Sequence, residues 1–79
     1  MKQIDLHGLF HDEALLKVEN FLLLESAKKL NEVFECKIIT GNSPTLQEKI
    51  IKNVLDKHNF SWSVSSYNQG AIIVSDTFL

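Results

Sequence analysis

The sequence lacks arginine altogether and contains a single cysteine, Cys36. One cysteine cannot form a disulfide within the chain, so we expect a protein of the reducing cytoplasm. The missing arginines and a formal net charge of −2 argue against a strong, non-specific grip on nucleic acid, which needs clustered cations. Residues 37–57 hold four lysines against two acids, so a polyanion is expected to meet this half of the chain and to be held loosely.

Long hydrophobic runs are also missing. The longest apolar cluster, residues 21–24, is far too short to span a bilayer, so no membrane partner is expected. Residues 1–6 lead into a strand-like alternation instead of the apolar stretch of a signal peptide. No internal repeat or low-complexity segment interrupts the chain. A chain of 79 residues, 44% hydrophobic and 23% charged, is typical of one small globular domain over residues 1–79.

Strand and helix patterns alternate along the chain. Period-two alternation and β-branched residues predict strands, and apolar residues at helical spacing predict helices. The expected elements, in chain order, are a strand over 2–6, a helix over 11–30, a strand over 35–40, a helix over 44–58, and strands over 61–67 and 71–74. This β-α-β-α-β-β order predicts a two-layer α/β sandwich, with a mixed four-stranded sheet and two helices on one face. The parallel pairs should have right-handed crossovers, and the final hairpin, turning at residues 68–70, should add one antiparallel edge.

The helix ends carry recognisable signals. His11 or Asp12 is expected to cap the first helix. Ser43 before Pro44 predicts the cap of the second helix, and residues 45–48 also fit a capping box. Asn59 is the expected stop. Leu23 and Leu24 widen the apolar stripe of the first helix beyond one core face, which indicates either a homo-oligomer contact or a helix that is simply well covered.

Asp5, His7 and Gly8 stand where the first strand ends. Asp5 and His7 are two residues apart, so their side chains project to the same face. A carboxylate beside an imidazole would raise the pKa of the histidine and fix its orientation, which suits general acid–base chemistry. The alternative is a turn histidine that bonds to the backbone and an aspartate that caps a neighbouring loop. His11 either supplies a second proton or caps the helix.

A second corner, Thr40-Gly41-Asn42-Ser43, follows the second strand. Sites in open α/β sheets usually lie at the carboxyl ends of strands. The backbone N–H groups of residues 41–45 open a helix and suit an anion, with Thr40, Asn42 and Ser43 side chains adding hydrogen bonds to a phosphate. The alternative is an ordinary capped helix, because the lysine and glycines of a P-loop are missing. No cysteine and histidine cluster has metal-ligand spacing.

Both corners resemble hallmarks of the Smr (small MutS-related) domain family. Ile-Asp-Leu-His-Gly-Leu at 4–9, followed by Asp-Glu-Ala-Leu at 12–15, is similar to the family's opening Leu-Asp-Leu-His-Gly motif. The second hallmark is a strand ending in His/Thr-Gly-x-Gly. Thr40 and Gly41 match it, and Ser43 replaces the second glycine. The resemblance covers nearly the whole chain, including the closing strand pair.

The resemblance implies a fold like the C-terminal domain of bacterial translation initiation factor three. It also implies endonuclease nicking of DNA or endoribonuclease activity on RNA, at branched, nicked or single-stranded regions. In that picture His7 or Asp5 assists the attack of water. The phosphate would be held by the Gly41 amides, with Gly8, His11, Asn42 and Lys49 lining the site.

Three questions stay open at this point. The resemblance does not fix whether a divalent metal takes part, or whether DNA or RNA is the substrate. The alternative to an enzyme is a non-catalytic module that binds nucleic acid or another protein.

Overall fold

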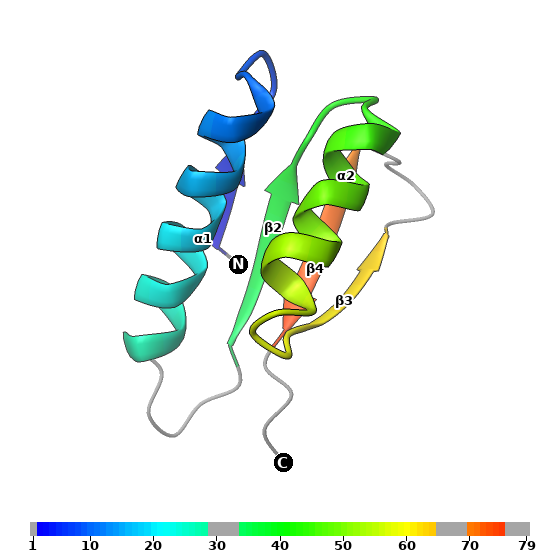
Figure 1. Ribbon diagram of the computed structural model, residues 1–79. Coiled ribbons are helices and arrows are strands. Elements are labelled where there is room, and N and C mark those ends of the chain that lie inside the picture. Colours follow the sequence, from blue (N-terminus) through cyan, green and yellow to red (C-terminus); the bar gives the residue numbers. More distant parts are fainter. Residues whose placement is uncertain (1, 29–33, 65–69, 76–79) are drawn as a thin grey trace.

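The computed structural model describes residues 2–28, 34–64 and 70–75. Its elements, in chain order, are β1 (Lys2–Asp5), α1 (His11–Lys28), β2 (Glu35–Ile39), α2 (Pro44–Ile50), its π-helical continuation η1 (Ile51–Leu55), β3 (Ser61–Val64) and β4 (Ala71–Ser75) (Figure 1). The predicted β-α-β-α-β-β order is confirmed. The hairpin turn expected at 68–70 lies outside the described residues except for Gly70, as does the expected end of the first helix at residues 29–30.

The four strands form one mixed sheet in the order β1-β2-β4-β3. β1 and β2 are parallel, and β4 is antiparallel to both of its neighbours. The hairpin does add an antiparallel pair at the edge, β4 with β3, but the sheet holds a second antiparallel pair that was not expected, β2 with β4, because β4 inserts between β2 and β3. Burial explains this position. β4 is apolar and mostly buried, as suits a central strand, whereas every residue of β3 is exposed, as suits an edge.

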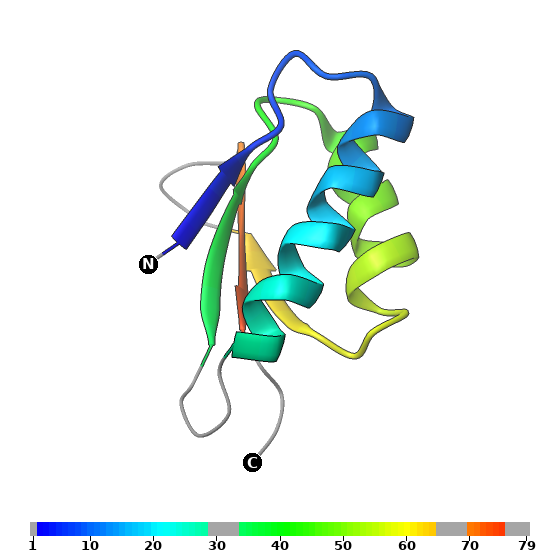
Figure 2. The same cartoon turned by 90° about the vertical axis from the view of Figure 1, so that its left-hand side faces the viewer.

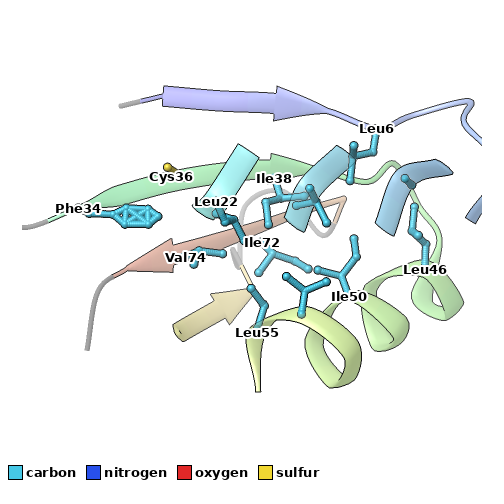
Figure 3. Packing of buried hydrophobic residues seen from close by; sticks show 13 residues of the cluster. Leu6, Leu22, Phe34, Cys36, Ile38, Leu46, Ile50, Leu55, Ile72 and Val74 are labelled. Atoms are coloured by element: carbon cyan, nitrogen blue, oxygen red, sulfur yellow. The ribbon is translucent and has the colours of Figure 1, made fainter. Parts of the chain in front are cut away.

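Both helices cover the same face of the sheet, which confirms the two-layer sandwich (Figure 2). Alternate strand residues point to this face and meet the buried sides of the helices. A T-shaped pair of Phe34 and Phe60, with ring centroids 5.7 Å apart, closes one end of the core. The buried cluster comprises Leu6, Ala14, Val18, Leu22, Phe34, Cys36, Ile38, Leu46, Ile50, Val54, Leu55, Ile72 and Val74 (Figure 3).

The helix ends follow the sequence signals only in part. The predicted capping of α1 by His11 or Asp12 is wrong: the helix begins at His11, and the Phe10 carbonyl accepts the Ala14 amide at 2.9 Å. Asp12 instead lies in the first turn, where a carboxylate suits the helix dipole. Ser43 does cap α2, since its hydroxyl accepts the Leu46 amide at 3.3 Å and Pro44 is the first helical residue.

Asn59 follows the second helix with a φ of +60°, the left-handed conformation that commonly ends a helix. The predicted stop is confirmed.

Candidate nucleic-acid corner

The two predicted corners meet at one edge of the sheet. β1 and β2 are parallel neighbours, so the loops that follow them lie at the same end (Figure 1). The imidazole of His7 lies against the backbone of Gly41: a Cβ atom built on Gly41 would be 3.8 Å from His7 Cδ2 and 3.9 Å from His7 Cβ. The structure therefore brings together residues from two motifs that are far apart in the sequence.

The loop after β1 is a tight turn that presents His7. The Leu6 amide continues the parallel ladder by donating to the Ile39 carbonyl at 2.7 Å, and the Leu9 amide closes the turn on the Leu6 carbonyl at 3.1 Å. Gly8, in the third position of this turn, has a φ of +84°. A type II turn needs positive φ at this position, which glycine adopts without steric cost. His7 stands in the second position and is exposed.

Asp5 stabilises this turn through the backbone. Its Oδ1 accepts the His7 amide at 2.9 Å, so its carboxylate caps the turn that carries the imidazole. Of the two interpretations offered for Asp5, the loop-capping one describes this contact. The Asp5 carboxylate therefore holds the backbone of His7, and its hydrogen bond is to the backbone amide of His7, not to the imidazole ring.

Thr40 is buried and its hydroxyl is engaged inside the fold. Oγ1 accepts a hydrogen bond from Gln47 Nε2 at 2.9 Å. Its proton faces two carbonyl oxygens, those of Gly70 at 3.0 Å and Gly41 at 2.9 Å. A hydroxyl carries one proton, so these contacts use its donor capacity. In this arrangement Thr40 positions the loop.

Several backbone amides of the second corner are likewise engaged. The amides of Thr40 and Gly41 donate to the Gly70 carbonyl at 2.7 and 3.1 Å, and the Ser43 amide donates to the Gly41 carbonyl at 2.8 Å. Pro44 has no N–H. Within the described ranges, the amides of Asn42 and Thr45 are the ones between residues 41 and 45 that remain for a ligand.

Sequence reasoning missed the roles of Gln47 and Gly70. The sequence gives Gln47 no role beyond its place within residues 45–48, and it gives Gly70 only a place in a hairpin turn. The available signals were slight: a glutamine one turn into the helix after Thr40-Gly41, and a glycine directly before the most apolar strand.

Lys49, in the last turn of α2, contacts the start of α1. Lys49 Nζ lies 3.1 Å from His11 Nδ1, which joins α2 to the start of α1. An ammonium group has donors only, so Nδ1 is the acceptor in this contact. Lys49 also lines an open groove of about 270 Å³; its other lining residues are Thr45, Glu48, Lys52 and Asn53.

An ion pair lies on the groove wall. Lys52 Nζ and Glu48 Oε1 are 2.9 Å apart. Their hydrogen bond lowers the pKa of Glu48 and raises the pKa of Lys52. Lys52 therefore stays protonated, and the Glu48 carboxylate balances much of its charge.

No group of three or more His, Cys, Asp or Glu side chains among the described residues is arranged to hold a metal ion. Neither described helix has the length and apolar character needed to cross a membrane.

These observations define a small two-layer α/β domain in which a His-Gly turn and a Thr-Gly loop meet at the ends of two parallel strands. The family model of the Smr domain matches residues 4–75, and the chain belongs to the Smr domain family. The fold is similar to that of the crystal structure of the Smr domain of Thermus thermophilus MutS2, with a TM-score of 0.77 and 24% sequence identity. This likeness covers 95% of this chain and 96% of that one. No curated protein matches the chain.

Ser43 occupies the place of the second glycine in the motif. Its φ of −130° and ψ of 88° lie in a region open to any residue. Gly41, in contrast, has a φ of +70°. The loop therefore needs the first glycine for its backbone conformation and tolerates serine at the second position.

Proposed function

We propose that this Smr domain binds DNA or RNA at the His7–Gly41 corner and cleaves a phosphodiester there. Smr domains are a family linked to nuclease function on nucleic acids. The observation that carries the proposal is the exposed imidazole of His7 lying against Gly41, in the segment that also carries the amides of Asn42 and Thr45. Branched, nicked or single-stranded regions are the proposed substrates, as the family resemblance implies.

His7 is the proposed proton-transfer group. An imidazole changes charge near neutral pH, so it can take the proton of an attacking water as the water oxygen bonds to phosphorus. The bond from phosphorus to the leaving sugar oxygen then breaks, and that oxygen keeps the bonding electron pair and takes a proton from solvent water. The two free amides and Lys49 would balance the negative charge that grows on the phosphate oxygens. Asp5 would keep the His7 turn in place.

Cleavage of end-labelled RNA and DNA, including nicked and branched duplexes, tests this proposal. His7→Ala is expected to lower the cleavage rate by about 100-fold or more, the usual contribution of a general acid or base. His58→Ala is the matched control, because it removes an imidazole from the turn after η1 and should leave the rate unchanged. Cleavage by His7→Ala at the native rate would contradict the proposal.

Two Asp5 variants separate chemistry from positioning. Asn in place of Asp5 keeps an oxygen that can accept the His7 amide but removes the charge, whereas alanine removes both. If Asp5 only holds the turn, Asp5→Asn keeps most of the activity and Asp5→Ala loses it. Equal loss in both variants would assign the carboxylate a chemical role.

A second candidate function is a non-catalytic nucleic-acid module. It is favoured by the Thr40 hydroxyl and the loop amides already in use within the fold, and by Lys49 at the groove. This hypothesis predicts salt-sensitive binding without turnover. Lys49→Ala should weaken that binding, and the affinity of this variant should depend less on the salt concentration than that of the native chain. Either function fits the cytoplasm, where the buried thiol of Cys36 would stay reduced.

A further inference from the structure

Phe10 is the most exposed large hydrophobic side chain of the described residues. It is 86% exposed, whereas Phe34 and Phe60 pack against each other at one end of the core. Trp62, the other exposed aromatic residue of the described ranges, is 41% exposed and lies on β3, at the sheet edge opposite β1. Phe10 is therefore the described aromatic residue that belongs to the loop carrying His7.

The backbone on both sides of Phe10 is held in place. Before it, Leu9 packs against the buried cluster, and the Leu9 amide closes the turn on the Leu6 carbonyl at 3.1 Å. The Phe10 carbonyl accepts the Ala14 amide at 2.9 Å, which begins α1. The fold thus presents the ring to solvent from an ordered backbone, so little backbone freedom is lost when a ligand covers the ring.

Phe10 lies between two parts of the proposed site. His7 stands three residues before it, so the two Cα atoms are at most about 11 Å apart. His11 is the next residue, and Lys49 Nζ lies 3.1 Å from its Nδ1. A strand that places a phosphate at His7 can therefore bring a neighbouring base to Phe10 and a further phosphate to Lys49.

We propose that Phe10 stacks on an unpaired base next to the phosphate held at the His7–Gly41 corner. This inference rests on the proposed function and names the feature of the nucleic acid that the corner selects. A base can stack on a side chain only when its face is free, as in a single strand, and not within a regular duplex. Every base has such a face, so Phe10 selects unpaired nucleotides without regard to sequence.

The charges beside Phe10 favour a base over a phosphate at this position. Asp12 and Glu13 lie in the first turn of α1 and are both exposed. Residues 3–13 contain neither lysine nor arginine. Carboxylates repel a phosphate but not a neutral base, so the affinity contributed here comes from stacking. The phosphates are left to the His7–Gly41 corner and to Lys49.

Binding of short labelled oligonucleotides tests the proposal. The probes are single-stranded DNA, single-stranded RNA and a blunt DNA duplex of the same mixed sequence. Initial fluorescence anisotropy reports binding, and a denaturing gel of the same samples reports cleavage. Phe10→Ala should weaken binding of both single strands at least about fivefold, the lower end of what one stacked base contributes. Phe10→Trp should retain the native affinity, because an indole ring also stacks. Duplex binding should be the same for all chains.

Leu24→Ala is the matched control. Leu24 is 63% exposed and lies near the far end of α1, so this variant loses an exposed apolar side chain away from the corner and should bind like the native chain. Circular dichroism checks that each variant stays folded. The salt dependence of the affinity separates stacking from charge: Phe10→Ala removes no cation and should keep the native slope, whereas Lys49→Ala should lower it.

The outcomes separate this inference from the proposed function. Equal single-strand affinity of Phe10→Ala and the native chain would overturn the stacking and leave the proposed function standing. An equal loss on the single strands and the duplex would overturn it as well, because an unpaired base would then not be what Phe10 selects. A native chain that binds none of the probes would overturn the proposed function and this inference with it.

Discussion

Gly70 packs so closely on Gly41 that a Cβ atom at position 70 would lie 3.0 Å from the Gly41 carbonyl carbon. The Gly70 carbonyl also accepts the amides of Thr40 and Gly41. The residue before β4 thus sets the position of the loop after β2. Because His7 lies against Gly41, Gly70 acts on the whole corner without reaching its surface.

Gly70→Ala should destabilise the fold by about 1–3 kcal/mol, the usual cost of adding a methyl group where backbone cannot yield. It should also weaken nucleic-acid binding by displacing Gly41. Urea unfolding and a binding titration measure the two effects. Equal stability of Gly70→Ala and the native chain would refute the close contact.

Thr40→Val should lower the free energy of unfolding by about 1–3 kcal/mol, because it leaves buried hydrogen-bonding groups without their hydroxyl partner. Thr40→Ser keeps the hydroxyl and should recover most of the loss. Thr45→Val, at an exposed position of the same region, should change stability by less than about 0.5 kcal/mol. Chemical denaturation of all three variants provides the comparison. Indistinguishable stabilities of Thr40→Val and Thr45→Val would show that the Thr40 hydrogen bonds contribute nothing.

Ser43→Gly restores the second motif glycine but should not improve the loop. Its stability should fall by only a few tenths of a kcal/mol, whereas Ser43→Ala should cost about 1 kcal/mol through loss of the helix cap. Cleavage and binding by Ser43→Gly should match those of the native chain. A gain of tenfold or more would mean that serine restricts the loop after all.

Acid should weaken the contact between α1 and the turn after η1. The hydrogen bond from His58, followed by the charge of Lys57, holds the pKa of Glu19 below its ordinary value of 4.5. A carboxyl with a lowered pKa stabilises the fold above its unfolded pKa, and this contribution is lost as pH falls through the folded pKa. Glu19→Gln should therefore be less stable than the native chain at neutral pH, and the difference should shrink below pH 4.5.

Urea unfolding across this pH range measures the effect. Asn20→Gln, an uncharged exchange at an exposed position of the same helix, is the control and should run parallel to the native chain. A constant difference between Glu19→Gln and the native chain down to low pH would contradict the assignment.

Local signals in the sequence were sufficient for most of the fold. Helical spacing located both helices, Ser43 before Pro44 marked the start of the second helix, and Asn59 marked its end. These features depend on neighbours within one or two turns, so a sequence displays them directly. The cap of α1 was predicted wrongly because polar residues in a first turn resemble capping residues.

The arrangement of the corner could not be predicted in the same way. The insertion of β4 between β2 and β3 depends on which strand buries more apolar surface, a property of the assembled sheet. That insertion brings Gly70 against Gly41. The Gly70 carbonyl there accepts hydrogen bonds from the Thr40 hydroxyl and from the amides of Thr40 and Gly41. The sequence predicts that His7 and Gly41 lie at the same edge of the sheet. It does not predict that the Thr40 hydroxyl and several loop amides are hydrogen-bonded within the fold.

The position of β4 also has a consequence for the folding pathway. β2 and β3 do not pair with each other in the described sheet; each pairs with β4, which follows both in the chain. During synthesis β4 leaves the ribosome after β2 and β3. The pair β1-β2 and the strand β3 therefore cannot be joined into one sheet until residue 75 has emerged. Such non-local pairing slows folding. The loop at Gly41 should therefore reach its final position in the same step that completes the sheet.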